Sequence, residues 1–344
     1  MNILFELNHP KHYYQFKYII NILEKRGHKI KIVARDKDIL LNLLKEEKVD
    51  FEIFGTHKEK LIFKIFSSIS IFISFNKILR KFNPDIVISK ASIYSTLLAK
   101  IKNINSIIFP DSEIVFLTNK FVAPLATKII TPKTFKLDYG KKHIRIQGLF
   151  ENCYLHPNVF KYEETIINEL QIVKPYVLLR FIGWTANHDI GKVGISDEKK
   201  IDIVHKLTKN FHVYITSEKK LPKELEPYRL KIPFSKIHQV LAGAELYIGD
   251  SQTMATEAGL LGTPSIRTNS FVGEKDMSNF IILENKYGLI KNVSLKEDLL
   301  KVIDELTCNG VKKEWQIKKK KYFADTGDLN ETIVNMIENT VSRN

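Results

Sequence analysis

Residues 248–267 read IGDSQTMATEAGLLGTPSIR, and this stretch holds the clearest structural pattern in the chain. The apolar residues that lead into it have the length of a buried strand, and the Gly-Asp-Ser segment at 249–251 supplies a turn. From Thr253 onward apolar residues recur at helical spacing until Gly262, which predicts a helix that ends at this glycine. A strand, a tight turn and a helix with free N–H groups together form an anion site. We therefore expect the start of this helix to bind phosphate.

The acidic residue of this stretch extends the prediction from phosphate to a nucleotide. Glu257 lies four residues after Thr253, about one helical turn, so its carboxylate would lie near the bound anion. A carboxylate accepts hydrogen bonds from a ribose diol. The pattern thus favours a nucleoside diphosphate as ligand. The alternative is an ordinary capped helix, because an acid in the first turns also suits the helix dipole.

The same residues resemble a known signature. They are similar to D-S-G-G-x-x-x-E-A-x-x-x-G-x-P in the second domain of GT-B nucleotide-sugar enzymes, which include glycosyltransferases and UDP-N-acetylglucosamine 2-epimerases. The matching positions are Asp250, Ser251, Glu257, Ala258, Gly262 and Pro264, with Gln252 and Thr253 in place of the two glycines. The resemblance implies that residues 250–253 surround a diphosphate and that Glu257 binds the ribose.

The length and rhythm of the chain predict two α/β domains. A chain of 344 residues with 44% apolar residues is too long for one comfortable core. Strand and helix patterns alternate, lapse at 144–157 and restart at 176, which predicts mainly parallel sheets covered by helices. We expect domains at 1–150 and 151–327, with a C-terminal helix at 328–344 that returns to the first domain. The resemblance implies two Rossmann-like domains facing a cleft, with the acceptor on the first and the nucleotide sugar on the second.

A second group of candidate residues follows the first predicted strand. The segment NHPKH, residues 8–12, places His9 and His12 at a strand end, where ligands collect in open α/β sheets. Histidine titrates near neutrality and suits proton transfer. Residues 12–28 resemble the GT-B pattern G-H-x-x-x-x-L-x-L-A-x-x-L-x-x-R-G-H, which implies that His12 is a general base or a sugar contact. His9 is then expected on the acceptor side. The alternative for His12 is a surface residue that caps the helix.

Two further strand ends carry ionisable residues. Asp111 and Glu113 lie in FPDSE, residues 109–113, and are candidate acids, bases or ligands of sugar hydroxyls. Lys90 follows the strand predicted at 86–89 and would bind the acceptor or a phosphate. The alternative for Lys90 is an ordinary surface lysine.

The second half contributes further candidates to the nucleotide-sugar site. Arg180 ends a predicted strand and would neutralise the diphosphate leaving group. Ile232, at the end of a short strand predicted at 229–232, and His238 resemble the segment whose backbone reads the base in GT-B enzymes. We expect Arg267 to face the cleft as well. Inverting GT-B enzymes usually lack a metal motif, so the resemblance implies neither a metal nor another cofactor.

The net charge and the cysteine content indicate which kinds of partner and which cellular compartment to expect. A net charge of +14 and a pI near 9.4 imply an anionic partner, such as a nucleotide diphosphate, an acidic lipid or nucleic acid. Basic residues do not alternate with aromatics as in an RNA-binding module, so we expect no nucleic acid. Cys153 and Cys308 lack metal-site spacing and are interpreted as free thiols. No signal peptide precedes the first strand, and we expect a cytoplasmic protein.

Residues 61–75, LIFKIFSSISIFISF, form the most hydrophobic segment. The segment is shorter than the roughly 20 residues of a membrane span. One interpretation is a helix that packs on a sheet. The other is a helix whose apolar side enters a membrane surface, with lysines and arginines around it for anionic headgroups. The protein would then lie peripherally on the inner face of the membrane.

These features together predict an inverting, metal-independent glycosyltransferase that uses a UDP-sugar in cell-surface glycan synthesis, with a glycan or lipid-linked acceptor. The N-terminal pattern and the segments NPDIVIS, FPDSE and TMATEAGLLGTP together resemble a prokaryotic family of small GT-B-like proteins. Two alternatives stay open. A UDP-N-acetylglucosamine 2-epimerase would use Glu113 and His12 to move protons, although residues 89–91 lack the aspartate of the epimerases' H-G-D segment. The other is a non-catalytic nucleotide-sugar-binding protein.

Overall fold

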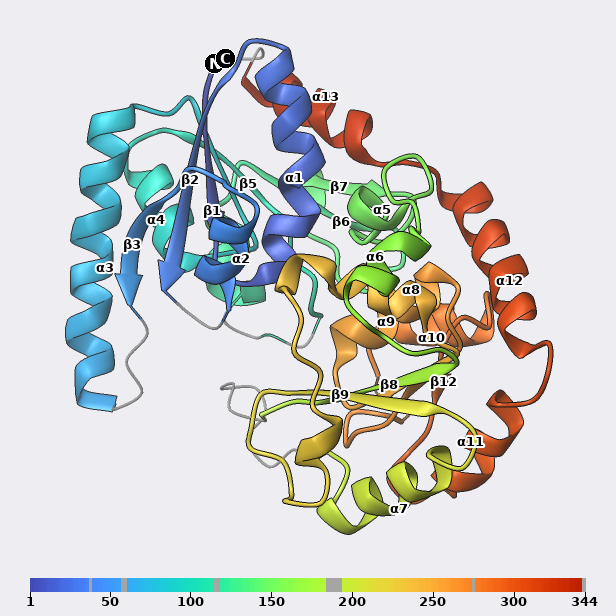
Figure 1. The fold of residues 1–344 in the computed structure, drawn as a ribbon. Coiled ribbons are helices and arrows are strands. Elements are labelled where there is room, and N and C mark those ends of the chain that lie inside the picture. Colours follow the sequence, from blue (N-terminus) through green and yellow to red (C-terminus); the bar gives the residue numbers. More distant parts are fainter. Residues whose placement is uncertain are drawn as a thin grey trace. The chain divides into compact units, whose positions relative to one another are not determined.

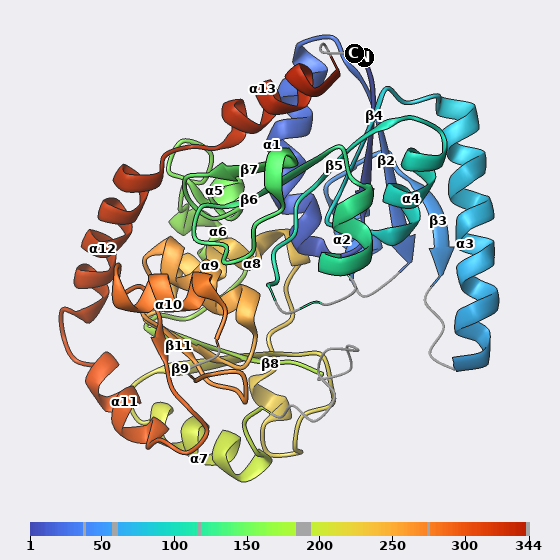
Figure 2. The same cartoon turned by 180° about the vertical axis from the view of Figure 1, so that it is seen from behind.

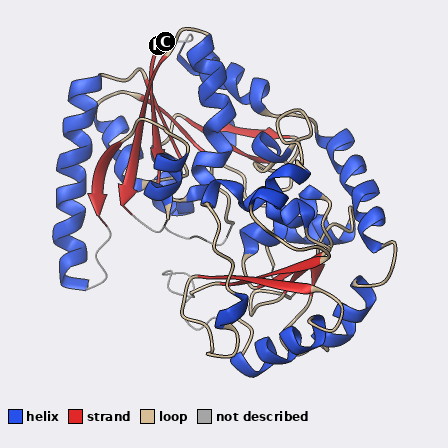
Figure 3. Ribbon diagram, in the orientation of Figure 1, coloured by secondary structure: helices blue, strands red, loops and turns tan. Residues whose placement is uncertain are grey.

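The chain divides into two compact units, drawn in Figure 1. The computed structural model describes residues 1–36, 39–56, 61–113, 115, 118–183, 194–273 and 276–341, with the backbone alone for residues 56 and 61–68. The first unit contains Met1–Val159 and Thr326–Asn344, and the second contains Phe160–Asp325. Each unit has its own sheet with helices around it, which Figure 3 separates by colour.

A seven-stranded sheet forms the centre of the first unit, with the order β3-β2-β1-β4-β5-β6-β7. All its pairings are parallel. The strands are β1 (Asn2–Leu7), β2 (Lys29–Asp36), β3 (Glu52–Thr56), β4 (Ile86–Ser89), β5 (Asn105–Ile108), β6 (Lys128–Pro132) and β7 (His143–Ile146). The helices are α1 (Pro10–Lys25), α2 (Leu40–Glu46), α3 (Leu61–Phe82), α4 (Ile93–Ile101), α5 (Asn152–Leu155) and α13 (Asn330–Val341), with short turns η1 (Thr118–Val122), η2 (Ala123–Leu125) and η3 (Gly140–Lys142).

Successive side chains of a strand point to opposite faces of its sheet, so neighbouring residues of β1 show which helices cover each face. Phe5 packs against Phe16 of α1, with ring centroids 5.3 Å apart. Its neighbour Leu4 lies in a buried cluster with Phe75 of α3 and Leu98 of α4. Helix α1 therefore covers one face, and α3 and α4 cover the other.

Among the helices that the structure describes, none is long and apolar enough to cross a membrane.

The C-terminal helix α13 belongs to the first unit. It packs on α1, and Arg26 forms ion pairs with Glu331 and with Glu338. The unit continues past the boundary expected at residue 150, to Val159. The reason is local, because the Asn152 side chain donates hydrogen bonds to Thr326 Oγ1 and Gly327 O, both over 2.8 Å. These bonds tie the segment after β7 to the returning C-terminal chain.

The second unit has a five-stranded parallel sheet in the order β12-β11-β10-β8-β9. Its strands are β8 (Tyr176–Phe181), β9 (His212–Ser217), β10 (Leu246–Gly249), β11 (Ser265–Arg267) and β12 (Lys291–Asn292). Its helices are α6 (Glu164–Glu169), α7 (Asp197–Leu207), α8 (Ile237–Gly243), α9 (Gln252–Leu261), α10 (Ser278–Asn285), α11 (Leu299–Leu306) and α12 (Val311–Thr326), with turns η5 (Glu226–Tyr228) and η6 (Phe234–Lys236).

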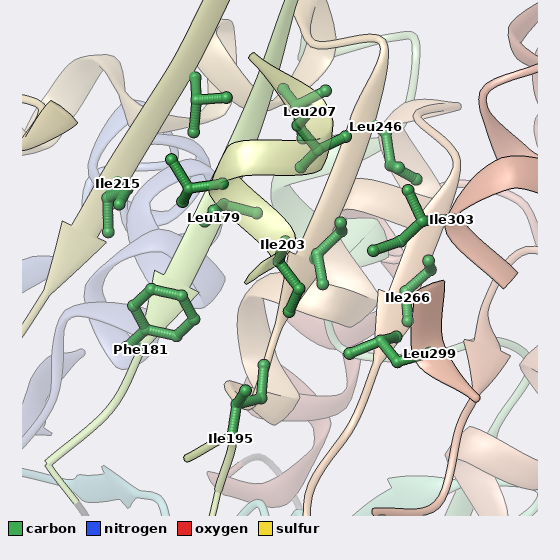
Figure 4. Close-up of a cluster of buried hydrophobic side chains, with 14 of the residues drawn as sticks. Leu179, Phe181, Ile195, Ile203, Leu207, Ile215, Leu246, Ile266, Leu299 and Ile303 are labelled. Carbon is green, nitrogen blue, oxygen red and sulfur yellow. The ribbon is translucent and has the colours of Figure 1, made fainter. Parts of the chain in front are cut away.

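The main core of the second unit lies between its sheet and the helices α7 and α11. Figure 4 shows side chains of β8, β10 and β11 meeting Ile203 and Leu207 of α7 and Leu299 and Ile303 of α11. Burial of these apolar side chains stabilises the unit by about 1.5–3 kcal/mol for each fully buried residue. Two Rossmann-like parallel-sheet units of this kind confirm the fold class expected from the sequence.

Candidate functional site

Three adjacent parallel strands of the first unit bring ionisable residues to one edge. The strands β1, β4 and β5 lie side by side, so their carboxyl ends share this edge. Lys90 follows β4 and Asp111 follows β5, and Lys90 Nζ lies 3.5 Å from Asp111 Oδ2. Lys11, which follows β1, approaches the same carboxylate oxygen at 3.9 Å. The structure therefore gathers residues that are far apart in the sequence into one charged cluster.

Lys90 lies inside this cluster and is not a surface lysine, since its side chain is 2% exposed. Its ammonium donates a hydrogen bond to Gln15 Oε1 over 2.9 Å and lies 4.0 Å from the centre of the Phe150 ring. Burial lowers the pKa of Lys90 to about 8, although the Asp111 carboxylate opposes this change. Lys90 is thus a buried cation whose charge depends on the neighbouring carboxylate.

Two members of the cluster were not predicted as site residues. Lys11 Nζ and Glu151 Oε1 form an ion pair over 2.7 Å, with both side chains largely buried. Glu151 lies in a stretch without periodicity, where no pattern singled it out. Lys11 lies in the NHPKH segment, where the prediction named only the two histidines as site residues. Lys11 and Glu151 are far apart in the sequence, so only their contact at the sheet edge shows that they form a pair.

Asp111 is the exposed acid of the cluster, with 41% of its side chain accessible. Removal from water alone would raise its pKa, but the ammonium groups of Lys90 and Lys11 outweigh this effect. They hold the pKa of Asp111 below its usual range. The carboxylate is therefore ionised at neutral pH and accessible to a ligand.

His12 lies next to these charges, and its ring has a defined tautomer. The backbone N–H of Asn8 donates a hydrogen bond to His12 Nδ1 over 3.1 Å. Because an amide N–H only donates, Nδ1 must be unprotonated, and neutral His12 carries its proton on Nε2. Burial and then the nearby positive charges lower the pKa of His12 well below its ordinary value. Of the two roles expected for His12, this geometry favours the sugar contact over the general base, since the ring presents an N–H donor.

His9 and Glu113 each make a local hydrogen bond. His9 is the exposed N-cap of α1, where its Nδ1 accepts a hydrogen bond from the Lys11 amide over 3.1 Å. This bond satisfies one of the free N–H groups at the helix start. Glu113 Oε1 accepts a hydrogen bond from the Lys136 amide over 2.7 Å. Glu113 therefore holds the loop after β6 through one carboxylate oxygen, and its catalytic role stays a prediction.

In the second unit, Asp250 ties the loops after three adjacent strands together. Its Oδ1 accepts a hydrogen bond from the Ile182 amide over 2.8 Å, after β8. Its backbone oxygen accepts a bond from Asn269 Nδ2 over 2.9 Å, after β11. Before it, a Cβ on Gly249 would lie 2.5 Å from Tyr247 Oη and 2.7 Å from the Arg180 oxygen, so a side chain does not fit there. Asp250 is buried and acts as a positioning group.

Helix α9 starts directly after this turn. Ser251 caps it, because Ser251 Oγ accepts a hydrogen bond from the Met254 amide over 3.3 Å. Gln252 and Thr253 follow in the first turn and are partly exposed. Gly262 ends the helix with φ of 80°. The structure thus has the expected strand, turn and helix, at Leu246–Gly249 and Gln252–Leu261, with the helix start at the carboxyl end of β10.

Glu257 lies in the second turn of α9 and is buried beside a histidine. Its Oε1 lies 3.2 Å from His238 Nε2 of α8. The two predicted nucleotide-sugar residues are therefore in contact, although they are 19 positions apart in the sequence. Arg180, at the end of β8, pairs with Glu218 over 2.5 Å. Glu218 also accepts a hydrogen bond from the Gly183 amide over 2.8 Å, so the Arg180 charge is partly neutralised within the unit.

Arg267 and Ile232 differ from the predictions. Arg267 is fully buried and therefore faces no cleft. Its guanidinium pairs with Asp276, donates to Asn292 Oδ1 over 2.7 Å and lies 3.6 Å from the centre of the Phe280 ring. We therefore remove it from the nucleotide-sugar set. Ile232 is partly buried in an irregular stretch, because the strand predicted at 229–232 is reduced to a single bridge between Ile215 and Arg229.

The fold is similar to that of several solved structures. A Listeria monocytogenes protein, provisionally assigned as a UDP-N-acetylglucosamine 2-epimerase, has a TM-score of 0.71 at 15% identity, with 99% of this chain and 95% of that chain covered. The UDP-N-acetylglucosamine 2-epimerase of Neisseria meningitidis, bound to UDP-N-acetylglucosamine, gives 0.66 at 13% identity, with 100% of both chains covered. The glycosyltransferase VinC, in complex with dTDP, gives 0.62 at 12% identity, again with 100% of both chains covered. These similarities show the fold.

Among curated proteins, no sequence matches this chain. A family model does match, over residues 1–342, and its description is "Protein of unknown function (DUF354)". The match spans nearly the whole length of both units. The chain therefore belongs to the DUF354 family.

Proposed function

We propose that this protein is an inverting, metal-independent glycosyltransferase that uses a nucleotide sugar, with UDP as the nucleotide, in cell-surface glycan synthesis. The observation that carries the proposal is the start of α9, where the partly exposed first turn follows β10 and Glu257 lies one turn further on. The free N–H groups there suit a diphosphate. The Neisseria structure with UDP-N-acetylglucosamine and the VinC structure with dTDP support a nucleotide ligand on this fold.

The second unit would hold the donor. The diphosphate binds the amides of Gln252 and Thr253, while Ser251 is engaged in capping the helix. Arg180 shares its charge between Glu218 and the diphosphate, and it stabilises the negative charge that develops on the leaving group. Glu257 accepts hydrogen bonds from the ribose diol, and His238 holds the carboxylate in position. No step of this binding uses a metal.

The first unit would hold the acceptor and accept its proton. The acceptor oxygen forms a bond to the anomeric carbon, while the bond from that carbon to the diphosphate oxygen breaks and UDP leaves with the electron pair. The proton of the acceptor hydroxyl passes to Asp111, which is ionised and accessible. Because the pKa of Asp111 is low, the transfer occurs late, when the bonded oxygen has become strongly acidic. The His12 N–H orients the acceptor as a hydrogen-bond donor.

One experiment separates this proposal from the alternatives. The protein is incubated with UDP-N-acetylglucosamine, with and without glycan and lipid-linked acceptors, in the presence of EDTA, and the products are resolved by chromatography and NMR. Acceptor-dependent UDP release with inversion at the anomeric carbon is the expected result. Conversion to the manno epimer, or release of N-acetylmannosamine without an acceptor, would overturn it. UDP binding without turnover would leave only a binding protein.

A UDP-N-acetylglucosamine 2-epimerase is the second candidate. The TM-score of 0.71 with the Listeria protein favours it. The cluster of the first unit argues against it, because Lys90 occupies the segment where epimerases have an aspartate and Glu113 is engaged with the Lys136 amide. An epimerase needs several placed acids and bases. The same incubation without an acceptor tests it directly.

A further inference from the structure

The outward side of α3 combines exposed isoleucines with basic residues. Ile69 and Ile73 are 54% and 64% exposed and lie one turn apart. Lys77, Arg80 and Lys81 continue the same side of the helix and are exposed as well. The opposite side faces the sheet, where Ile71 and other apolar residues are buried. In Figure 1, α3 forms the outer flank of the first unit, and none of the other helices described for that unit covers this side.

Helix α4 extends this surface. It packs against α3. Helix α3 leads into β4 and helix α4 leads into β5, and these two parallel strands are neighbours in the sheet. The C-terminal ends of both helices therefore lie at the same edge of the sheet. Figure 2 shows this pair from behind. Ile101 at the end of α4 is 66% exposed and lies between Lys100 and Lys102. We call Ile69, Ile73, Lys77, Arg80, Lys81 and Ile101 the α3–α4 face.

The charge of this face has one sign. Neither α3 nor α4 contains an aspartate or a glutamate. Asp85, which lies between the two helices in the sequence, accepts a hydrogen bond from the Asn2 amide over 2.7 Å. The face therefore attracts anions. Its isoleucines can leave water only if the partner also offers them an apolar region.

We propose that the α3–α4 face binds the surface of an anionic lipid bilayer. A bilayer offers anionic headgroups for the basic residues and, directly beneath them, acyl chains for the isoleucines. A nucleic acid would satisfy the charges but not Ile69, Ile73 and Ile101. A second copy of this chain, packed about a two-fold axis, would place like charges against one another. The bilayer is thus the occupant that matches both components.

This inference deepens the proposed function, because a bilayer surface would deliver a lipid-linked acceptor to the first unit. Binding itself needs no turnover, so the two proposals fail separately. A protein that binds vesicles but transfers no sugar would overturn the enzymatic proposal alone. A protein that transfers sugar to a soluble acceptor and ignores vesicles would overturn the inference about the α3–α4 face alone.

Co-sedimentation with vesicles tests the face. The probes are phosphatidylcholine vesicles with and without phosphatidylglycerol, at low and high salt. We expect binding that rises with phosphatidylglycerol and falls with salt. Each basic residue near the surface contributes about a fivefold factor, so the triple variant Lys77→Glu, Arg80→Glu, Lys81→Glu should reduce partitioning by about 100-fold or more. The double variant Ile69→Ser, Ile73→Ser should reduce it by about tenfold.

Helix α12 offers a matched control. Ile317 is 69% exposed on a lysine-rich helix of the second unit, so Ile317→Ser removes an equally exposed isoleucine elsewhere. We expect it to leave partitioning unchanged within about twofold. Thermal unfolding of each variant verifies the fold. A wild type that stays in the supernatant with anionic vesicles at low salt would overturn the proposal. An equal loss of vesicle partitioning in the Ile317→Ser control would also overturn it. So would a dimer, observed by sedimentation velocity, that dissociates in the Ile69→Ser, Ile73→Ser variant.

Discussion

The Nδ1 atom of His12 accepts a hydrogen bond from the Asn8 backbone amide over 3.1 Å. This contact joins the first turn of α1 to the end of β1 and determines where the imidazole carries its proton. With Nδ1 occupied as an acceptor, only Nε2–H is available to a ligand. A histidine at this position then acts as a hydrogen-bond donor, and proton acceptance falls to Asp111.

The His12 tautomer predicts different effects for two substitutions. His12→Ala removes the donor and should lower turnover by about 100-fold. His12→Gln keeps an N–H donor and should lose about tenfold or less. Nitrogen NMR of the wild type should show Nδ1 unprotonated and no titration between pH 6 and 8, because the pKa of His12 is lowered well below its ordinary value. Equal losses in both variants, or titration near the ordinary pKa, would restore the general-base interpretation.

If Asp111 accepts the proton, Asp111→Asn should reduce turnover by roughly 10²- to 10⁴-fold. UDP affinity should change little, because the proposed donor site lies in the second unit. Glu113→Gln serves as the matched control, since it changes a nearby acid that binds the Lys136 amide. Steady-state kinetics together with calorimetry of UDP binding distinguish the two. Equal losses in turnover for both variants would assign the proton to another group.

The ribose contact predicts a loss of affinity in the second unit. Glu257→Gln should weaken UDP binding by about 1–3 kcal/mol, because a charge-assisted acceptor becomes a neutral one. Glu198→Gln, on the exposed first turn of α7, is the control. Calorimetry measures both, and thermal unfolding shows whether loss of the His238 contact disturbs the fold. Unchanged UDP affinity in a folded Glu257→Gln protein would remove Glu257 from the site.

Glu6 predicts a pH dependence of stability. It is fully buried in β1, where its Oε1 accepts a hydrogen bond from Asn8 Nδ2 over 2.9 Å. Burial raises the pKa of Glu6 above 4.5, and the hydroxyls of Ser95 and Ser92 offset this only in part. The folded state therefore binds more protons than the unfolded state above that pH, and stability falls as pH rises through the folded pKa.

The measurement is thermal unfolding of Glu6→Gln and wild type across pH. The variant should match the wild type near pH 4 and exceed it in melting temperature near pH 8, because the amide has no charge to bury. Glu24→Gln, an exposed acid on α1, should show no such difference. A variant less stable than the wild type at pH 8 would mean that the ionised carboxylate is held favourably.

The turn before α9 predicts a steric effect. A Cβ at Gly249 would lie 2.5 Å from Tyr247 Oη and 2.7 Å from the Arg180 oxygen. Gly249→Ala should therefore destabilise the protein by about 1–3 kcal/mol in denaturant unfolding and weaken UDP binding. Adding Tyr247→Phe removes the hydroxyl but leaves the ring carbon at 2.9 Å and the Arg180 oxygen, so it should recover only part of the loss. Full stability in Gly249→Ala would show that this turn shifts easily.

Residues 248–267 were sufficient to predict a local structure because their signals are local. The apolar run, the Ser251 cap and the αL glycine at Gly262 each act within one turn, and the helix ends where they predict. The same spacing could not locate Arg267, because its burial depends on Asp276 and Phe280, which come from a later segment. A buried ion pair is a property of packing, and its two members need no fixed spacing.

The sequence by itself determined the alternation of strands and helices, the two parallel sheets and the start of α9, because periodicity and capping are properties of neighbouring residues. Only the tertiary structure decided which strand ends meet. The order β1-β4-β5 places the ammonium groups of Lys11 and Lys90 each within 4 Å of the Asp111 carboxylate, and Glu151 joins them from beyond β7. Strand order results from the packing of whole layers, so the charges that define this cluster become neighbours only when the sheet has formed.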